Sequence, residues 1–282
     1  MSYTTRFAPS PSGPLHIGHA FSALTAFDRA RAQHGAFLLR IEDIDTARCT
    51  AAWEQQIYND LHWLGLAWPG PVMRQSNRMP AYRAALGHLI GLGLVYPCRC
   101  TRGDIRAALS APQEGVPLHG PDGLIYPGTC RTRRMPDATP ADSLRLNMAA
   151  ALAHLARPLA FTETGPLHTG THSLTPDTLV QSVGNIVLAR RDMGTSYHLS
   201  VVVDDAAQGI TEVVRGADLF EATQIHVVLQ ALLDLPRPTY HHHDLIRDDT
   251  GKRLAKRDDA RAIRHYRDEG FMPADIRRMV GL

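Results

Sequence analysis

The chain has 282 residues, a formal net charge of +2 and a sequence pI of about 8.4, with 44% hydrophobic and 21% charged residues. These values are ordinary for a folded protein of one large or two smaller domains, and they exclude a disordered or a strongly basic chain. No stretch of about twenty apolar residues predicts a membrane span, the first residues are too polar for a signal peptide, and the use of four cysteines favours a reducing compartment, so we expect a cytoplasmic protein.

The N-terminal segment combines a short strand, a loop rich in Pro and Gly, and a helix. Residues 3–8 predict the strand, and apolar positions at helical spacing predict a helix over Ala20–Gln33 that opens at or just after His19. A helix N-terminus after such a loop presents N–H groups to an anion, and His16 and His19 can donate to phosphate oxygens. The alternative is an ordinary turn with two surface histidines.

A second strand is predicted over Ala36–Ile41, and it ends in the acidic run Glu42-Asp43-Ile44-Asp45. Ligands of open parallel sheets bind at the carboxyl edge of the strands, so these carboxylates are candidate ligand groups, although a solvated acidic turn is the alternative. The apolar spacing next predicts helices over Trp53–Leu66 and Tyr82–Leu94.

The region from residue 96 to residue 190 is rich in Gly, Pro, Thr and His, and it contains Cys98, Cys100 and Cys130. Three thiolates in two close groups can clamp a tetrahedral Zn²⁺, whereas a Cys-x-Cys pair is poorly placed for a disulfide. The chemistry leaves the fourth ligand open. His119 is the usual ligand type, but Tyr126 lies four residues before Cys130 and completes a second local prong, so we choose Tyr126, with His119 or water as alternatives.

The second half of the chain returns to strands and helices. Strands are predicted over 186–189 and 210–219, helices over the apolar run that follows Tyr197 and over 220–233. Arg215, near the end of its strand, can present a fork to a carboxylate, although a structural pair with Asp218 is the alternative. The strand Tyr240–His243 carries three histidines that point to opposite faces in turn and so cannot easily share a metal ion.

A turn and a basic loop follow at residues 248–257, and one more helix is predicted over Asp275–Val280. Lys256 is the lysine of this loop that we single out as a phosphate contact. A solvated basic loop is the alternative for this segment when it is considered alone.

The string Pro-Leu-His-Ile-Gly-His at residues 14–19 resembles the HIGH signature of class I aminoacyl-tRNA synthetases, and the preceding Arg-Phe-Ala-Pro-Ser-Pro-Ser-Gly is similar to their glutamate-specific branch. The glutamine branch usually carries Glu and Asn where Ser10 and Ser12 stand. The loop at 248–257 resembles the second signature, KMSKS, with Arg253 in place of the leading lysine and Ala255 in place of the serine. The segment Cys-x-Cys…Tyr-x₃-Cys resembles the zinc insertion of glutamyl-type enzymes, which uses a tyrosine.

This resemblance implies an α/β fold in which a Rossmann-type parallel sheet is split by a zinc-containing α+β insertion and followed by a short helical C-terminal stub. The expected parts are residues 1–97, the insertion 98–190 on the tRNA acceptor side, 191–258 and 259–282. Arg131, Arg133 and Arg134 are candidate basic residues of the insertion. The resemblance also implies the following site residues: Arg6, Ala8, Ser10, Glu42, Tyr197 and Arg215 for L-glutamate; His16, Gly18, His19 and Lys256 for ATP with Mg²⁺; His16, His19 and Lys256 as catalytic groups; and Cys98, Cys100, Tyr126 and Cys130 for one structural Zn²⁺.

The absence of an anticodon-reading region, together with the degenerate second signature, resembles the truncated branch that attaches glutamate to the queuosine base of tRNA(Asp). We therefore expect a monomeric, ATP-dependent ligase with glutamate, ATP and queuosine-bearing tRNA(Asp) as partners, and no membrane partner. Two alternatives stay open at this point: a truncated glutamyl-tRNA synthetase that charges tRNA 3′ ends, and a non-catalytic module that binds an amino acid or tRNA.

Overall fold

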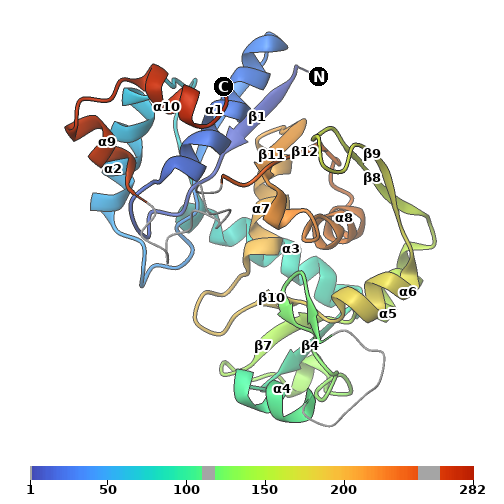
Figure 1. Cartoon of the computed structure of the whole chain (residues 1–282). Helices are drawn as coiled ribbons and strands as arrows, with labels where there is room; N and C mark the ends of the chain where they lie inside the picture. The colour runs from blue at the N-terminus through green and yellow to red at the C-terminus, as the bar shows by residue number, and fades with distance from the viewer. Residues whose placement is uncertain (1, 110–117, 247–260) are drawn as a thin grey trace.

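The structure is a computed structural model that describes residues 2–109, 118–246 and 261–282. Figure 1 shows helices packed around parallel strands in the upper part of the molecule and a smaller antiparallel region below it. The two described ends of the chain lie in the upper part, near β1 and α10.

Three parallel strands form the sheet of the N-terminal half, in the order β1 (Thr4–Phe7), β2 (Ala36–Ile41) and β3 (Met73–Arg74). The register pairs Thr4 with Ala36 and Phe7 with Leu39. Both predicted strands of this half are confirmed. All of β1 and most of β2 are buried, the polar residues Thr4, Thr5, Arg6 and Arg40 included, because helices and loops cover both faces of a parallel sheet.

A second sheet has the order β11 (Glu212–Gly216), β12 (Thr239–His243), β8 (Leu159–Glu163) and β9 (Gly170–Leu174), of which only β9 runs antiparallel. The Thr211 N–H donates to the Thr4 carbonyl at 3.0 Å, so β11 begins beside β1 (Figure 1). β8 and β9 come from the segment between residues 98 and 190. This sheet therefore draws on residues from both sides of the expected boundary at residue 190.

An antiparallel sheet with the order β10 (Val187–Ala189), β7 (Ser143–Leu146) and β4 (Val95–Cys98), together with the hairpin of β5 (His119–Gly120) and β6 (Gly123–Leu124), makes up the lower part of the molecule. The predicted strand over residues 186–189 is confirmed. It pairs with β7 rather than with a parallel strand, so the return to the parallel sheet occurs only after it.

The helices over the described residues are α1 (Ile17–Ala32), α2 (Ala51–Trp63), α3 (Met79–Gly91), α4 (Arg102–Leu109), α5 (Met148–Leu155), α6 (Pro176–Thr178), α7 (Tyr197–Ala207), α8 (Thr223–Leu232), α9 (Ile263–Asp268) and α10 (Pro273–Met279). Their cores form separate clusters: one joins α1, α2 and the C-terminal helices through residues such as Leu24, Ile57 and Ile276, and another joins α3, α7 and α8. None of these described helices is long and apolar enough to cross a membrane.

The predicted helices exist, but several of them start elsewhere: α3 begins at Met79 rather than Tyr82, α8 at Thr223 rather than Phe220, and α10 at Pro273 rather than Asp275. α1 begins at Ile17, before His19, because the His16 side chain caps it. α2 begins two residues early, since Thr50 accepts a hydrogen bond from the Trp53 N–H. The prediction that Gly65 ends this helix is confirmed, because Gly65 follows the C-cap with a φ of 79°. The prediction of one final helix misses α9, a short helix whose Ile263 and Tyr266 side chains are buried against the N-terminal half.

Candidate active site and metal centre

A cavity of about 620 Å³ opens where the carboxyl ends of β1, β2, β11 and β12 meet. Parallel strands bring residues that are distant in the sequence to one edge, which is where ligands of such sheets bind. The lining includes every residue predicted for glutamate and three of those predicted for ATP: Arg6, Ala8, Ser10, Glu42, Tyr197, Arg215, His16, Gly18 and His19. Lys256, Arg253 and Ala255 lie outside the described residues.

His16 and His19 form the first turn of α1, and their rings stand 3.8 Å apart between centroids. His16 Nδ1 accepts the Gly18 N–H at 3.2 Å, and His19 Nδ1 accepts the His16 N–H at 3.1 Å. A neutral imidazole carries one proton, so both rings carry it on Nε2. The start of α1 therefore holds two imidazoles in the tautomer that donates from Nε2, beside the positive end of a helix dipole.

Gly18 allows this arrangement because of its missing side chain. A Cβ at this position would lie 3.1 Å from Cε1 and 3.2 Å from Nδ1 of His16, closer than most real Cβ contacts. The tight packing of the His16 ring against the backbone of α1 explains physically why glycine stands between the two histidines.

Buried charges connect the walls of the cavity. Asp205, on α7, accepts from Arg6 Nε at 2.9 Å and from Arg40 Nη1 at 2.6 Å, and Arg40 Nη2 donates to Glu42 at 3.1 Å. The Arg40 side chain is fully buried and Asp205 is 8% exposed. The positive charges of Arg6 and Arg40 thus balance the negative charges of Asp205 and Glu42, and the ion pairs fix the positions of these side chains.

The pKa values of the two carboxyl groups move in opposite directions. Burial would raise the pKa of Asp205, but the charges of Arg6 and Arg40 outweigh it and lower the pKa to about 2. Burial raises the pKa of Glu42, and its single bonded arginine offsets only part of that effect. Asp205 is therefore a firmly ionised structural anion, whereas Glu42 is a carboxylate for which an additional cation would be favourable.

Arg215, at the end of β11, is buried and makes its hydrogen bonds to His242, His226, Thr223 and the Leu219 carbonyl. The alternative prediction of a structural pair with Asp218 is not what these contacts show. The histidines of β12 point to different surroundings, as predicted: His241 bonds Thr164, His242 bonds Glu163, and His243 bonds Ser22.

Several residues in or behind the cavity wall were missed by reasoning from sequence. Arg40 and Asp205 complete the charge network. The signals of this role in the sequence were weak: Arg40 stands two residues before Glu42, and Asp205 follows an apolar run. Gln75 also lines the cavity and donates to Asp204 at 2.9 Å. Cys49, to which the sequence assigned no role, is another lining residue.

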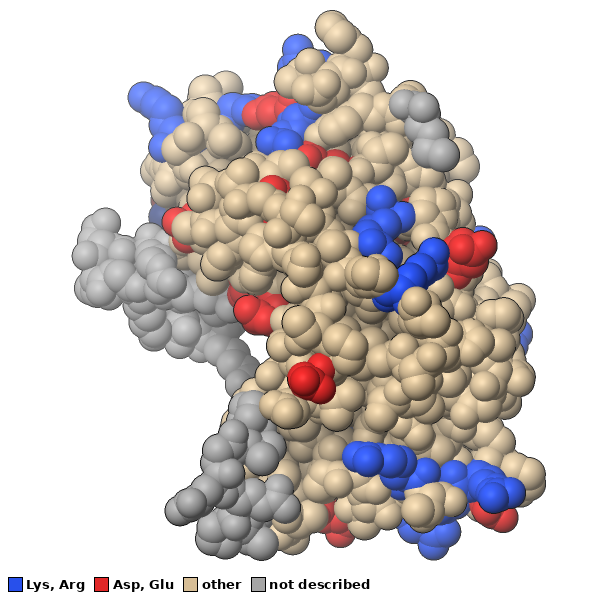
Figure 2. Space-filling model, turned by 90° about the vertical axis from the view of Figure 1, so that its right-hand side faces the viewer, with Lys and Arg blue, Asp and Glu red and all other residues tan. Residues whose placement is uncertain are grey.

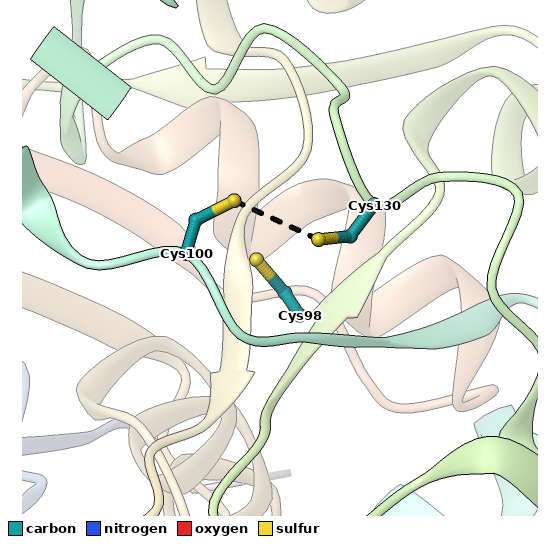
Figure 3. A group of neighbouring side chains, drawn as sticks. All are labelled: Cys98, Cys100 and Cys130. Atoms are coloured by element: carbon teal, nitrogen blue, oxygen red, sulfur yellow. Dashed lines mark hydrogen bonds between the residues drawn. The ribbon is translucent and has the colours of Figure 1, made fainter. Parts of the chain in front are cut away.

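The three predicted cysteine ligands converge. The Sγ atoms of Cys98, Cys100 and Cys130 lie within 4.8 Å of one another, and Figure 3 shows the side chains pointing toward a common centre. The Tyr126 hydroxyl lies 3.3 Å from Cys98 Sγ and 3.4 Å from Cys100 Sγ. His119 does not belong to this group. Three sulfurs and one oxygen around a small space fit a tetrahedral metal ion.

The predicted basic residues of the 98–190 segment divide into two kinds. Arg133 is half-buried, and its guanidinium makes two bonds to Asp142, at 2.6 and 3.0 Å, so part of its charge is already paired within the protein. Arg131 and Arg134 are exposed. Figure 2 shows Lys and Arg side chains gathered at the lower end of one face, the end where Figure 1 places α4 and β7.

Comparison with known proteins agrees with this geometry. Residues 2–116 and 173–282 match the family described as tRNA synthetases class I (E and Q), catalytic domain. The chain is 63% identical over 281 residues to a glutamyl-Q tRNA(Asp) synthetase of Rhodobacter capsulatus, covering 99% of each, and 42% identical over 266 residues to one of Geobacter sulfurreducens, covering 93% of this chain and 78% of that protein.

A solved glutamate tRNA ligase from Elizabethkingia meningosepticum, in complex with its amino acid, superposes with a TM-score of 0.77 at 26% identity. The glutamate-tRNA synthetase of Elizabethkingia anophelis gives a TM-score of 0.78 at 25% identity. All of this chain is covered in both comparisons, but it spans only 61% of the length of those two chains.

The buried anion predicts an acid-sensitive fold. The pKa of Asp205 is lowered from 3.8 to about 2, so the stability it contributes is fully present above pH 4 and is lost as the pH falls toward 2. We expect Asp205→Asn to lower the unfolding free energy at pH 7 by about 3 kcal/mol, because buried arginines lose their partner. Between pH 5 and pH 2 the variant should lose about 2 kcal/mol less than the wild type.

Urea denaturation at several pH values measures both effects. Asp28→Asn is the control, since the pair of Asp28 with Arg277 is 39% and 31% exposed and should contribute less than about 1 kcal/mol. Equal acid dependence of the wild type and Asp205→Asn would contradict the assignment.

Proposed function

Because the chain belongs to the class I tRNA synthetases of the glutamate and glutamine branch, among the glutamyl-Q tRNA(Asp) synthetases, we propose that it activates L-glutamate with ATP and transfers it to the queuosine base of tRNA(Asp). It is an ATP-dependent ligase of the aminoacyl-tRNA synthetase type. One observation carries the proposal: residues predicted for two substrates, from separate stretches of the chain, line one cavity.

In the first step the glutamate α-carboxylate attacks the α-phosphorus of ATP. An oxygen–phosphorus bond forms, the bond to pyrophosphate breaks, and glutamyl-adenylate remains. The enzyme contributes position and charge. His16 and His19 donate from Nε2 to phosphate oxygens at the start of α1. Gly18 leaves room for the His16 ring to pack against the backbone of α1. Lys256 completes the phosphate contacts, and Mg²⁺ arrives with ATP.

Glutamate is held by groups of opposite charge. Glu42 receives the ammonium group, which supplies the additional cation that its buried carboxylate favours. Arg215 and Arg6 receive the side-chain carboxylate, while Tyr197, Ala8 and Ser10 form the wall of the glutamate site. Glutamine would set its amide donor against guanidinium donors, which is a strong basis for selection.

In the second step a hydroxyl of the queuosine base attacks the carbonyl carbon of glutamyl-adenylate, and AMP leaves. We infer that tRNA lies along the 98–190 segment, where exposed arginines such as Arg131 and Arg134 can contact phosphates. Residues 1–97 and 191–258 would provide the two halves of one Rossmann-type sheet, with β8 added to the second half, and residues 259–282 the helical stub.

A structural Zn²⁺ held by Cys98, Cys100, Tyr126 and Cys130 would stabilise the segment that carries these arginines. Tyr126 is the preferred fourth ligand because its hydroxyl already lies among the sulfurs, and the Arg145 guanidinium stands 4.0 Å from the centre of its ring, where it offsets negative charge. We further propose a monomeric, cytoplasmic enzyme.

The first prediction separates the enzyme from a binding module and from a 3′-end charging enzyme, which the likeness to glutamate tRNA ligases keeps as the second candidate. We expect glutamate, and not glutamine, to support ATP–pyrophosphate exchange. Labelled glutamate should transfer to tRNA that contains queuosine and not to queuosine-deficient tRNA. Undiminished labelling of the deficient tRNA would refute the queuosine acceptor, and absence of exchange would favour the module.

The second prediction concerns the metal. Elemental analysis of fresh protein should find about one zinc per chain. Cys130→Ser should lose it, and Tyr126→Phe should release it faster to a chelator, whereas His119→Ala should behave like the wild type. Less than about a tenth of an equivalent of zinc in the wild type would refute the site. Loss in His119→Ala with retention in Tyr126→Phe would make His119 the ligand.

The third prediction concerns Gly18. We expect Gly18→Ala to lower kcat of the exchange reaction by about tenfold or more, because its Cβ displaces the His16 ring, while the KM for glutamate changes little. Gly87→Ala in α3 is the matched control, since a Cβ there meets nothing within 4 Å. Both variants should melt no lower than the wild type, because alanine favours a helix. Equal activity of the two variants would contradict the role of Gly18.

A further inference from the structure

Arg215 is a buried cation whose side-chain partners are neutral groups rather than carboxylates. Its Nε donates to His242 Nε2 at 3.0 Å, its Nη1 to His226 Nδ1 at 3.1 Å, and its Nη2 to Thr223 Oγ1 at 2.8 Å. Arg6 differs, because it bonds the carboxylate of Asp205 directly. The two arginines of the cavity are therefore held by different chemistry.

The contacts determine where the proton of His242 lies. A guanidinium has donors only, so His242 Nε2 must be the unprotonated nitrogen that accepts from Arg215. The single proton of the neutral ring then lies on Nδ1, which donates to Glu163 Oε2 at 2.5 Å. This neutral state agrees with the lowered pKa of His242, which burial and the Arg215 charge produce against the opposing effect of Glu163.

Glu163 is committed to this arrangement on both of its oxygens. Its side chain is fully buried at the end of β8, and Oε1 accepts the His242 N–H at 2.8 Å and the Gly165 N–H at 2.6 Å. Only Oε2 remains for the His242 ring. Two backbone donors thus fix the carboxylate, and the carboxylate fixes the ring.

We propose that Glu163 and His242 are positioning residues for amino-acid selection: Glu163 sets the tautomer of His242, and this tautomer holds the Arg215 guanidinium for the side-chain carboxylate of glutamate. The proposal rests on the proposed function, which assigns that carboxylate to Arg215. A neutral acceptor orients the guanidinium without neutralising it, so its charge stays available to the substrate. The carboxylate that balances the Arg215 charge is Glu163, which is separated from the guanidinium by the His242 ring.

A second chain of hydrogen bonds leads from Arg215 through two histidines to a carboxylate, and it can be compared with the chain through His242 to Glu163. His226 Nδ1 accepts from Arg215, so His226 donates from Nε2 to His198 Nδ1 at 3.1 Å, and His198 donates from Nε2 to Asp122 at 3.3 Å. This second chain also ends in a carboxylate, but the Asp122 side chain is 32% exposed and can rearrange, whereas Glu163 is fully buried.

The substitution Glu163→Gln tests the proposal. The carboxamide oxygen of the variant must serve the two backbone donors, so its NH₂ group faces His242 Nδ1. That nitrogen then has to accept, the ring proton moves to Nε2, and two donors oppose each other between His242 and Arg215. We expect the KM for glutamate in ATP–pyrophosphate exchange to rise about tenfold or more, with the KM for ATP changed less than about twofold. Asp122→Asn, whose oxygen can turn toward His198, should leave the glutamate KM within about twofold.

Imidazole ¹⁵N spectra of the wild type give a readout that does not depend on whether Glu163→Gln folds. The His242 signal is assigned by its loss in His242→Gln. His242 should carry its proton on Nδ1, and its signal should shift with glutamate and not with ATP. A proton on Nε2, or no shift with glutamate, overturns the proposal, as does an equal rise of the glutamate KM in Glu163→Gln and Asp122→Asn. A wild type without glutamate-dependent exchange would instead refute the proposed function.

Discussion

The carboxylate of Asp205 is the interaction on which the shape of the cavity depends. It joins α7 to Arg6 on β1 and to Arg40 on β2, and the Arg6 guanidinium also reaches the Val214 carbonyl on β11 at 3.4 Å. Elements from both halves of the chain are therefore held at one buried charge. Because both arginines are almost fully buried, loss of the anion would leave two poorly solvated cations without their partner. The geometry of the proposed glutamate site follows from satisfying these charges.

The two arginines that line the cavity have different partners, and this difference gives them different roles. Arg6 makes a direct ion pair with Asp205, which joins β1 to α7 and leaves less of its charge for the substrate carboxylate that it is proposed to share with Arg215. Arg215 is held by imidazoles, so it keeps a charge that an incoming carboxylate can use. A site with two fully neutralised arginines would bind glutamate and glutamine with less distinction, since selection between a carboxylate and an amide depends on a positive charge that no carboxylate of the protein already neutralises.

The parts of the site that were predictable from the sequence lie in local motifs. The run from Arg6 to His19 places a strand end, a loop and a helix start in one stretch, so its residues reach the cavity together. The pairing of Arg40 with Asp205 spans 165 positions and leaves no local pattern. The same is true of Glu163 and His242, which meet only because β8 pairs with β12. The start of α1 was misplaced because the His16 side chain caps the backbone, and histidine is an uncommon cap.

The histidines that line the cavity and those buried behind it show how a fold assigns opposite roles to one kind of side chain. Backbone N–H groups donate to Nδ1 of His16 and His19, which places the proton on Nε2 and makes each ring a donor suited to an anion. At His242 a carboxylate accepts from Nδ1, which removes the proton from Nε2 and makes that ring an acceptor suited to a cation. The partner of Nδ1 thus decides what Nε2 can recognise. A site proposed to receive phosphates near a buried guanidinium uses both kinds of histidine, and it obtains them from the partners that the fold sets against each ring.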